Sequence, residues 1–310
     1  MSRQIRLPFK GMMAPTFTPF KDDGSLDLDL VKPYAAHLKA VGVTGVWVNG
    51  TAGEGMSMML PERKAVAEAW LACRADVPVV IVQCGAGCLK DTHDLARHAA
   101  EKGADGVAVL PLLFDPPKTT DDLVDYMVEV AKACPSTPLF YYHIPMKTGV
   151  KLSMSEFLEK GVKRIPTLSG IKFTDEDVSG EGRKCLKVDG GNLTVFNGFD
   201  QMLQKSLSVG FTSSVNAGFT FLPHLGARIF SLMEAGDVEE ALKVQERLTS
   251  CYDIIYRQNG GAFSAAYMKA ASSILTGLQF GPTRLPVKPL TEEMRATLKR
   301  DLEKHGLKVY

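Results

Sequence analysis

Val79-Val80-Ile81-Val82-Gln83 is a short run of mainly β-branched residues, and it is followed by a helix-like stretch, Thr92 to Lys102, and by a second apolar run, Gly106-Val107-Ala108-Val109-Leu110. Strands that are buried on both faces of a parallel sheet appear as continuous apolar runs, and a crossover helix joins two such strands. Gly103 lies where that helix would end before the next strand. This segment therefore predicts a right-handed strand–helix–strand unit.

The same alternation recurs along most of the chain. We expect eight strands, at residues 12–17, 43–48, 79–83, 106–110, 139–142, 168–173, 194–197 and 211–215. Helical periodicity lies between them, at residues 28–41, 61–74, 92–102, 120–133 and 155–162. Eight such units close naturally into an α/β fold of the (β/α)₈ TIM-barrel type, and an open doubly wound sheet of similar strand count is the rival fold.

The last part of the chain does not continue this alternation. From residue 222 to residue 305 it shows only helical patterns, which are interrupted at Gly236, at Gly260-Gly261 and at Gly281-Pro282. No Gly/Ser-rich linker separates the two regions. We therefore expect one structural unit, in which a barrel over residues 1–221 carries a packed C-terminal helical extension over residues 222–310.

Composition and charge exclude several classes of protein. The 310 residues include 36 Lys and Arg against 35 Asp and Glu, a net charge of +1 without a basic block, which argues against nucleic-acid binding. No apolar run is long enough to span a membrane, and residues 1–10 lack the apolar core of a secretory signal, so we expect a cytoplasmic protein. The six cysteines are too sparse for a disulfide scaffold and lack zinc spacing, which predicts reduced, packed thiols and no metal site.

Lys172 is the first candidate for chemistry, in Leu168-Ser169-Gly170-Ile171-Lys172-Phe173-Thr174. In a barrel of this type the active site forms at the carboxyl ends of the strands. Burial lowers the pKa of a lysine, and the resulting neutral amine can attack a carbonyl to form a Schiff base. The alternative is a lysine at the strand end whose ammonium group reaches solvent.

Tyr142 ends the preceding strand, in Phe140-Tyr141-Tyr142-His143-Ile144-Pro145. A phenol on the neighbouring strand could move protons for the lysine. Only one of Tyr141 and Tyr142 can point inward, because side chains alternate along a strand. The alternative for Tyr142 is a buried structural tyrosine, and His143 beside Pro145 is more typical of a structural histidine.

A glycine-rich segment, Asn49-Gly50-Thr51-Ala52-Gly53-Glu54-Gly55, follows the second strand. Successive backbone N–H groups around a hydroxyl can form a small nest for a carboxylate. The segment is neither a P-loop nor a dinucleotide fingerprint, because the required Gly-Lys-Ser/Thr and G-x-G-x-x-G patterns are missing. A plain glycine turn is the alternative.

Taken together and in this order, the three segments resemble the pyruvate-dependent class I aldolases of the dihydrodipicolinate synthase and N-acetylneuraminate lyase family. The resemblance covers the chain from about Leu7 to Pro289 and is greatest to the sialate-cleaving branch. It implies reversible Schiff-base cleavage of N-acetylneuraminate (sialic acid) to N-acetylmannosamine and pyruvate, with no metal or organic cofactor. It also implies a homotetramer.

The resemblance further implies a role for each residue that matches a family motif. Lys172 would form the imine with a 2-keto acid, and Tyr142 would shuttle the proton of the C4 hydroxyl. The substrate-binding residues would be Thr51, Ala52, Thr174, Gly198, Asp200, Gln201 and Ala217. Within this set, Thr51 and neighbouring amides would hold the carboxylate, Thr174 would assist at the C4 hydroxyl, and Asp200 would bind chain hydroxyls.

Several positions depart from the family pattern. Ala52 replaces a hydroxyl residue of the carboxylate loop, Gln201 replaces a glutamate, and Ala217 replaces a serine that is expected to touch the substrate. Lys147 is basic where sialate lyases have an apolar residue. We therefore expect altered affinity for the sugar portion. The alternatives are a pyruvate-dependent lyase or synthase for another 2-keto-3-deoxy acid, and a non-catalytic barrel that binds sugar acids.

Overall fold

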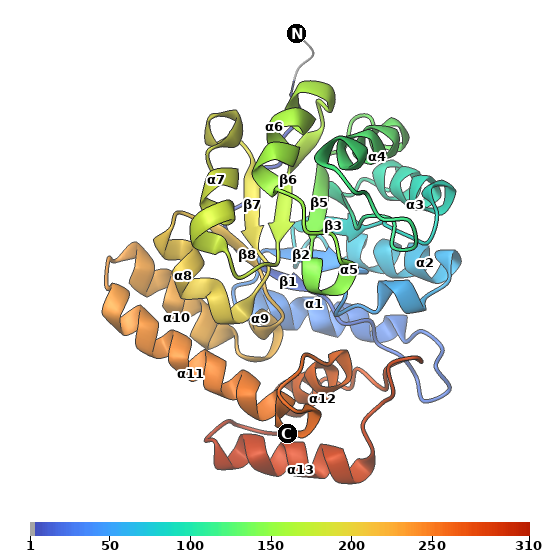
Figure 1. The fold of residues 1–310 in the computed structure, drawn as a ribbon. Coiled ribbons are helices and arrows are strands. Elements are labelled where there is room, and N and C mark those ends of the chain that lie inside the picture. The colour runs from blue at the N-terminus through green and yellow to red at the C-terminus, as the bar shows by residue number, and fades with distance from the viewer. Residues whose placement is uncertain (1–3) are drawn as a thin grey trace. The chain divides into compact units, whose positions relative to one another are not determined.

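Eight parallel strands form a closed barrel in the computed structural model, which describes residues 4–310 (Figure 1). They follow one another around the barrel in chain order: β1 (Gly11–Pro15), β2 (Gly45–Val48), β3 (Val79–Gln83), β4 (Gly106–Val109), β5 (Leu139–His143), β6 (Leu168–Phe173), β7 (Thr194–Asn197) and β8 (Ser213–Val215). The predicted TIM barrel is confirmed, and the open doubly wound alternative is wrong.

Helices alternate with these strands and then continue alone. They are α1 (Val31–Ala40), α2 (Leu60–Leu71), α3 (Leu89–Glu101), α4 (Thr120–Ala133), α5 (Pro145–Thr148), α6 (Met154–Arg164), α7 (Arg183–Cys185), α8 (Leu203–Ser208), α9 (Gly218–Phe221), α10 (Pro223–Glu234), α11 (Val238–Tyr256), α12 (Ala265–Thr276) and α13 (Glu292–Lys304). The predicted helical tail is confirmed as α10 to α13, with breaks near Gly236 and Gly260.

Local sequence explains where several of these elements begin. Helix α4 begins after Thr119, whose hydroxyl accepts from the Asp122 N–H while the Asp122 carboxylate accepts from the Thr119 N–H. This reciprocal pair satisfies two backbone donors that the helix itself cannot satisfy. Pro61 lies in the first turn of α2, where its missing N–H costs no hydrogen bond.

Two differences from the predicted elements have a local cause. Strand β8 begins at Ser213 rather than at Phe211, because the Phe211 N–H donates to the carbonyl of Ser206 at the end of α8. The short helices α5, α7, α8 and α9 were not predicted, since three to six residues are too few to show a helical period.

The chain divides into two compact units. One contains Val79–Val215 together with the N-terminal segment up to Gly11, and the other contains Met12–Pro78 and Asn216–Tyr310. The helical tail therefore belongs to the same unit as β1 and β2. The expected division into a barrel over residues 1–221 and an extension over residues 222–310 stays a prediction.

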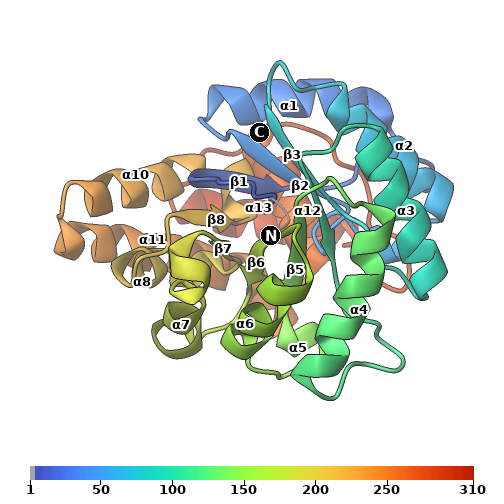
Figure 2. The same ribbon diagram turned by 90° about the horizontal axis from the view of Figure 1, so that it is seen from above.

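In the first unit, β5, β6 and β7 lie side by side and are buried on both faces (Figure 1). The rings of Phe140 and Phe196 lie 5.7 Å apart on one face. On the other face, the ring of Tyr141 packs 5.3 Å from that of Phe157 on α6. Figure 2 shows α4 and α6 outside β5 and β6, so Tyr141 points to the helical layer. Residues that alternate with Tyr141, including Tyr142, therefore face the barrel interior.

In the second unit, an aromatic cluster joins α1 to α2 and to the tail. The ring of Tyr34 lies 5.2 Å from that of Trp70 and 4.8 Å from that of Phe280, with both pairs edge-on. Helices α11, α12 and α13 pack against one another (Figure 1). Within residues 4–310, no helix is both long and apolar enough to cross a membrane.

Gly170 is the position in β6 that tolerates no side chain. A Cβ atom there would lie 1.8 Å from the carbonyl oxygen of Thr194, its partner residue on β7. We expect Gly170→Ala to lower the free energy of unfolding by at least about 2 kcal/mol, because a backbone contact cannot move aside. Urea unfolding measures this change. The matched control is Gly87→Ala, where no atom lies within 4 Å, and an equal loss in both variants would contradict the packing argument.

Candidate functional site

Lys172 and Tyr142 face each other across neighbouring strands. They are register partners in the β5–β6 pair, and Lys172 Nζ lies 4.3 Å from the centroid of the Tyr142 ring. The two side chains are nearly inaccessible, with exposed fractions of 4% for Lys172 and 2% for Tyr142. The alternative in which the lysine head reaches solvent is therefore wrong. A buried amino group on an aromatic face has the enclosed, weakly solvated environment in which carbonyl addition by lysine is favoured.

Thr174 supplies a buried hydroxyl at the end of β6. Its N–H donates to the carbonyl of His143, and its Oγ1 has no hydrogen-bond partner among the residues that the structure describes. Leaving a buried hydroxyl without a hydrogen bond costs free energy, so such a group calls for an explanation. One explanation is that the Thr174 hydroxyl is available to bind another molecule.

Gly198 makes room for both Thr174 and Lys172. A Cβ atom at residue 198 would lie 2.0 Å from Thr174 Oγ1 and 3.2 Å from Lys172 Cε. The Gly198 N–H donates to the carbonyl of Phe173, which fixes this close approach. The structure thus brings three of the predicted site residues, Lys172, Thr174 and Gly198, into contact distance.

His143 lies on the other face of β5. Its ring stacks on that of Phe173 at 5.4 Å, and its Nε2 lies 3.6 Å from Asp175 Oδ2. Burial lowers the pKa of His143 to about 4, while Asp175 opposes this shift. A neutral ring packed in this way fits the structural role that the sequence favours for this histidine.

The segment after β7 holds the remaining candidates of the first unit. Asp200 begins a 3₁₀ turn, η5 (Asp200–Met202), and is buried, whereas Gln201 is exposed. The buried Asn197 side chain donates to the carbonyl of Phe199 and accepts from its N–H, so it fixes the backbone on both sides of Gly198. Asn197 is not among the predicted site residues. Its position as the last residue of β7, at the carboxyl end of a barrel strand, is the signal that could have identified it as a site residue.

Three predicted residues belong to the second unit. Thr51 is half-buried, and Ala52 is buried beside it in the loop after β2. In this loop the N–H groups of Glu54 and Gly55 donate to the carbonyls of Thr51 and Gly50, so these two amides are used within the turn. Ala217 is buried at the start of α9.

Among residues 4–310, no group of three or more His, Cys, Asp or Glu side chains is placed so that it could hold a metal ion. The six cysteines are free thiols, and five of them are buried. Cys88 is exposed, and its sulfur accepts a hydrogen bond from the Asp91 N–H at the start of α3.

Comparison with known proteins agrees with this fold over nearly the whole chain. The model of the dihydrodipicolinate synthetase family matches residues 8–305. The chain belongs to this family.

Similar members of the dihydrodipicolinate synthetase family include lyases from animals and bacteria. N-acetylneuraminate lyase of Pongo abelii is 35% identical over 286 residues, which cover 92% of this chain and 88% of the relative. The structure of Proteus mirabilis N-acetylneuraminate lyase superposes with a TM-score of 0.90 at 32% identity and covers 97% of this chain and 99% of that one. The sialic acid aldolase of Aliivibrio salmonicida gives the same TM-score and identity. The predicted membership of the pyruvate-dependent class I aldolases is confirmed.

The buried state of His143 predicts a pH dependence of stability. An unfolded histidine binds a proton below about pH 6.5, but the folded one binds it only below about pH 4. Between these two pH values the unfolded chain binds more protons than the folded chain. The contribution of His143 to the free energy of unfolding is therefore complete above pH 6.5 and is lost as the pH falls toward 4.

We expect the free energy of unfolding to fall by on the order of 3 kcal/mol more in the wild type than in His143→Phe between pH 6.5 and pH 4. Denaturant titrations across this range measure the difference. Parallel pH profiles for the two proteins would show that His143 is not the group responsible.

Proposed function

We propose that this protein cleaves N-acetylneuraminate reversibly to N-acetylmannosamine and pyruvate through a Schiff base on Lys172. The observation that carries the proposal is the buried amino group of Lys172, 4.3 Å above the Tyr142 ring, with the unpartnered hydroxyl of Thr174 close by. Relatives that are 32–35% identical over most of their length and bear the name N-acetylneuraminate lyase support the choice of substrate.

In the proposed reaction, side chains of this protein supply the nucleophile and the proton carrier. The Lys172 amine adds to C2 of the keto acid, and water leaves to give a protonated imine. Tyr142 accepts the proton of the C4 hydroxyl as the C3–C4 bond breaks, and the electron pair of that bond moves into the imine. The sugar leaves as an aldehyde, the enamine is protonated at C3, and water releases pyruvate and restores the lysine.

The keto-acid carboxylate is assigned to the loop after β2. Thr51 supplies a hydroxyl there, and the amides next to it complete the site, since those of Glu54 and Gly55 are used inside the turn. Ala52 removes one of the two hydroxyls that the family usually has. The missing hydrogen bond weakens carboxylate binding by roughly 0.5 to 1.5 kcal/mol, which is compatible with function.

The sugar portion is assigned to Gly198, Asp200, Gln201 and Ala217, with Thr174 at the C4 hydroxyl. Gln201 offers both a donor and an acceptor in place of a carboxylate, and Ala217 offers neither. These changes leave the imine chemistry in place and alter the groups that would recognise the sugar hydroxyls.

A second candidate function is cleavage or synthesis of a different 2-keto-3-deoxy acid. The exposed cation Lys147 lies on α5, four residues beyond the end of β5, and it favours a substrate with a second anionic group. The pairing of Lys172 with Tyr142 argues against a barrel that only binds sugar acids. A homotetramer and a cytoplasmic location remain predictions.

Borohydride reduction in the presence of pyruvate tests the Schiff base. We expect intact-mass analysis to show one covalent pyruvyl adduct that maps to Lys172 in the wild type and none in Lys172→Ala. Cleavage of N-acetylneuraminate should also be lost in Lys172→Ala, because no other group provides the covalent electron sink. An adduct at another residue would refute the mechanism, and release of pyruvate only from other 2-keto-3-deoxy acids would refute the substrate.

The substitution Tyr142→Phe tests the role of the phenol hydroxyl separately from that of the aromatic ring. The phenylalanine keeps an aromatic face beneath Lys172 but cannot accept or donate a proton. We expect turnover to fall by roughly 10²- to 10⁴-fold, the range for a lost general acid or base, while pyruvate trapping on Lys172 persists in part. Steady-state kinetics and trapping on the same preparation measure both effects. Full activity in Tyr142→Phe would refute the proton-shuttle role.

A further inference from the structure

Glu54, in the loop proposed to bind the carboxylate, has an unusual backbone conformation. Its φ of 53° and ψ of 33° lie in the left-handed region, which residues other than glycine seldom occupy. Its side chain is also buried, with an exposed fraction of 6%. A strained, buried and charged residue persists only where its surroundings hold it in place.

Two segments of the helical tail hold the Glu54 carboxylate. Lys269 Nζ on α12 lies 3.0 Å from Glu54 Oε1, and the Arg284 N–H donates to Oε2 over 2.8 Å. Both carboxylate oxygens are thereby engaged, so Glu54 is not a free acid or base. Its partners come 215 and 230 residues later in the chain.

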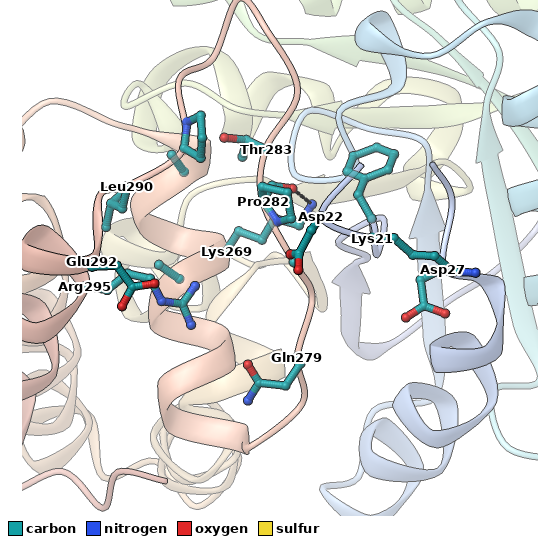
Figure 3. A pocket seen from close by; sticks show the side chains of 15 residues that line it. Lys21, Asp22, Asp27, Lys269, Gln279, Pro282, Thr283, Leu290, Glu292 and Arg295 are labelled. Atoms are coloured by element: carbon teal, nitrogen blue, oxygen red, sulfur yellow. Dashed lines mark hydrogen bonds between the residues drawn. The ribbon is translucent and has the colours of Figure 1, made fainter. Parts of the chain in front are cut away.

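Lys269 is itself enclosed on several sides. Its exposed fraction is 1%, its Nζ donates to the carbonyl of Pro282 over 2.8 Å, and it lies 4.2 Å from the centroid of the Phe20 ring. Lys269 and Pro282 both line a cavity of about 560 Å³. Figure 3 shows the Lys269 side chain reaching Pro282. Burial lowers the pKa of Lys269 to about 8, against the opposing charge of Glu54, so the ammonium form predominates at neutral pH.

Backbone hydrogen bonds connect Glu54 to the other residues of the loop. The Glu54 N–H donates to the carbonyl of Thr51, the Ser57 N–H donates to the carbonyl of Glu54, and the Gly55 N–H donates to that of Gly50. A Cβ atom at Gly55 would lie 2.0 Å from the Asn49 carbonyl oxygen, so the turn is closed as tightly as glycine permits. The peptide groups between Thr51 and Glu54 therefore cannot reorient while Glu54 is held.

We propose that Lys269 is a positioning residue for the keto-acid carboxylate: by holding Glu54, it keeps the loop after β2 in the form that presents the Thr51 hydroxyl and the adjoining amides. The inference rests on the proposed function, because it assigns the carboxylate to this loop. It gives the helical tail a direct part in building the site, through one buried ion pair within the second unit.

The test compares a keto acid with its neutral ester. Pyruvate and methyl pyruvate present the same ketone to the imine-forming lysine, but only pyruvate has a carboxylate for the loop. We measure the concentration of each that gives half-maximal borohydride trapping, by intact mass, for the wild type, Lys269→Met and Glu54→Gln. A loss of folding or of Lys172 reactivity would affect both compounds equally.

For Lys269→Met and Glu54→Gln we expect the half-saturating pyruvate concentration to rise at least about tenfold, the loss typical of one misplaced charge-assisted hydrogen bond. The value for methyl pyruvate should change by less than about twofold. In turnover, KM for the keto acid should rise by a similar factor while kcat changes little, as expected when binding shared by ground and transition states is lost.

Arg6→Met is the matched control. Arg6 also forms a 3.0 Å ion pair, with Asp189, and donates to a main-chain carbonyl, that of Pro166, but it belongs to the first unit. We expect it to leave both trapping concentrations unchanged. If Lys269→Met alone unfolds the protein by leaving a buried carboxylate unpaired, the double variant Lys269→Met/Glu54→Gln removes both charges and carries the same expectation.

The possible outcomes separate the two proposals. Trapping by the wild type together with an unchanged pyruvate concentration in the variants overturns the positioning role alone, and so does an equal rise for pyruvate and methyl pyruvate. The absence of any pyruvate adduct in the wild type overturns the proposed function and this inference with it.

Discussion

The contact between the Lys172 amino group and the face of the Tyr142 ring is the constraint on which the candidate site depends. It requires that β5 and β6 pair with residue 142 opposite residue 172. A slip of one residue would turn either side chain to the helical layer, because strands alternate with a period of two. Gly170 and Gly198 protect this arrangement, since a side chain at either position would collide with β7 or with the site itself.

The candidate catalytic residues of the first unit lie on barrel strands, whereas the candidate carboxylate-binding residues of the second unit lie in a loop. In the first, the site residues lie at the ends of β6 and β7, and the unpartnered Thr174 hydroxyl lies beside Lys172. In the second, a left-handed Glu54 is held by α12 and by the segment at Arg284. The tail is therefore more than a covering layer. It belongs with β1 and β2 in one compact unit, and its buried Lys269 forms an ion pair with Glu54 in the loop after β2.

Imine formation and substrate recognition place different demands on the sequence. Imine formation needs one buried lysine and one proton carrier, which are the roles that we propose for Lys172 and Tyr142. Recognition of a polyhydroxylated chain needs several polar groups in fixed positions, and of the residues proposed for it Gln201 offers a different set of donors and acceptors and Ala217 offers none. A family can keep its reaction while the substrate changes, because function resides in the site rather than in the fold.

The sequence by itself determined the eight strands, the helical tail and the aldolase family, and it named Lys172 as a candidate, because strand periodicity, glycine stops and short motifs are local properties of the chain. It left open which of Tyr141 and Tyr142 faces inward, and it gave no sign that Asn197 fixes the backbone around Gly198. It also missed the ion pair of Glu54 with Lys269. Only the tertiary structure decided these points, since each depends on strand register or on contacts between residues up to 215 positions apart.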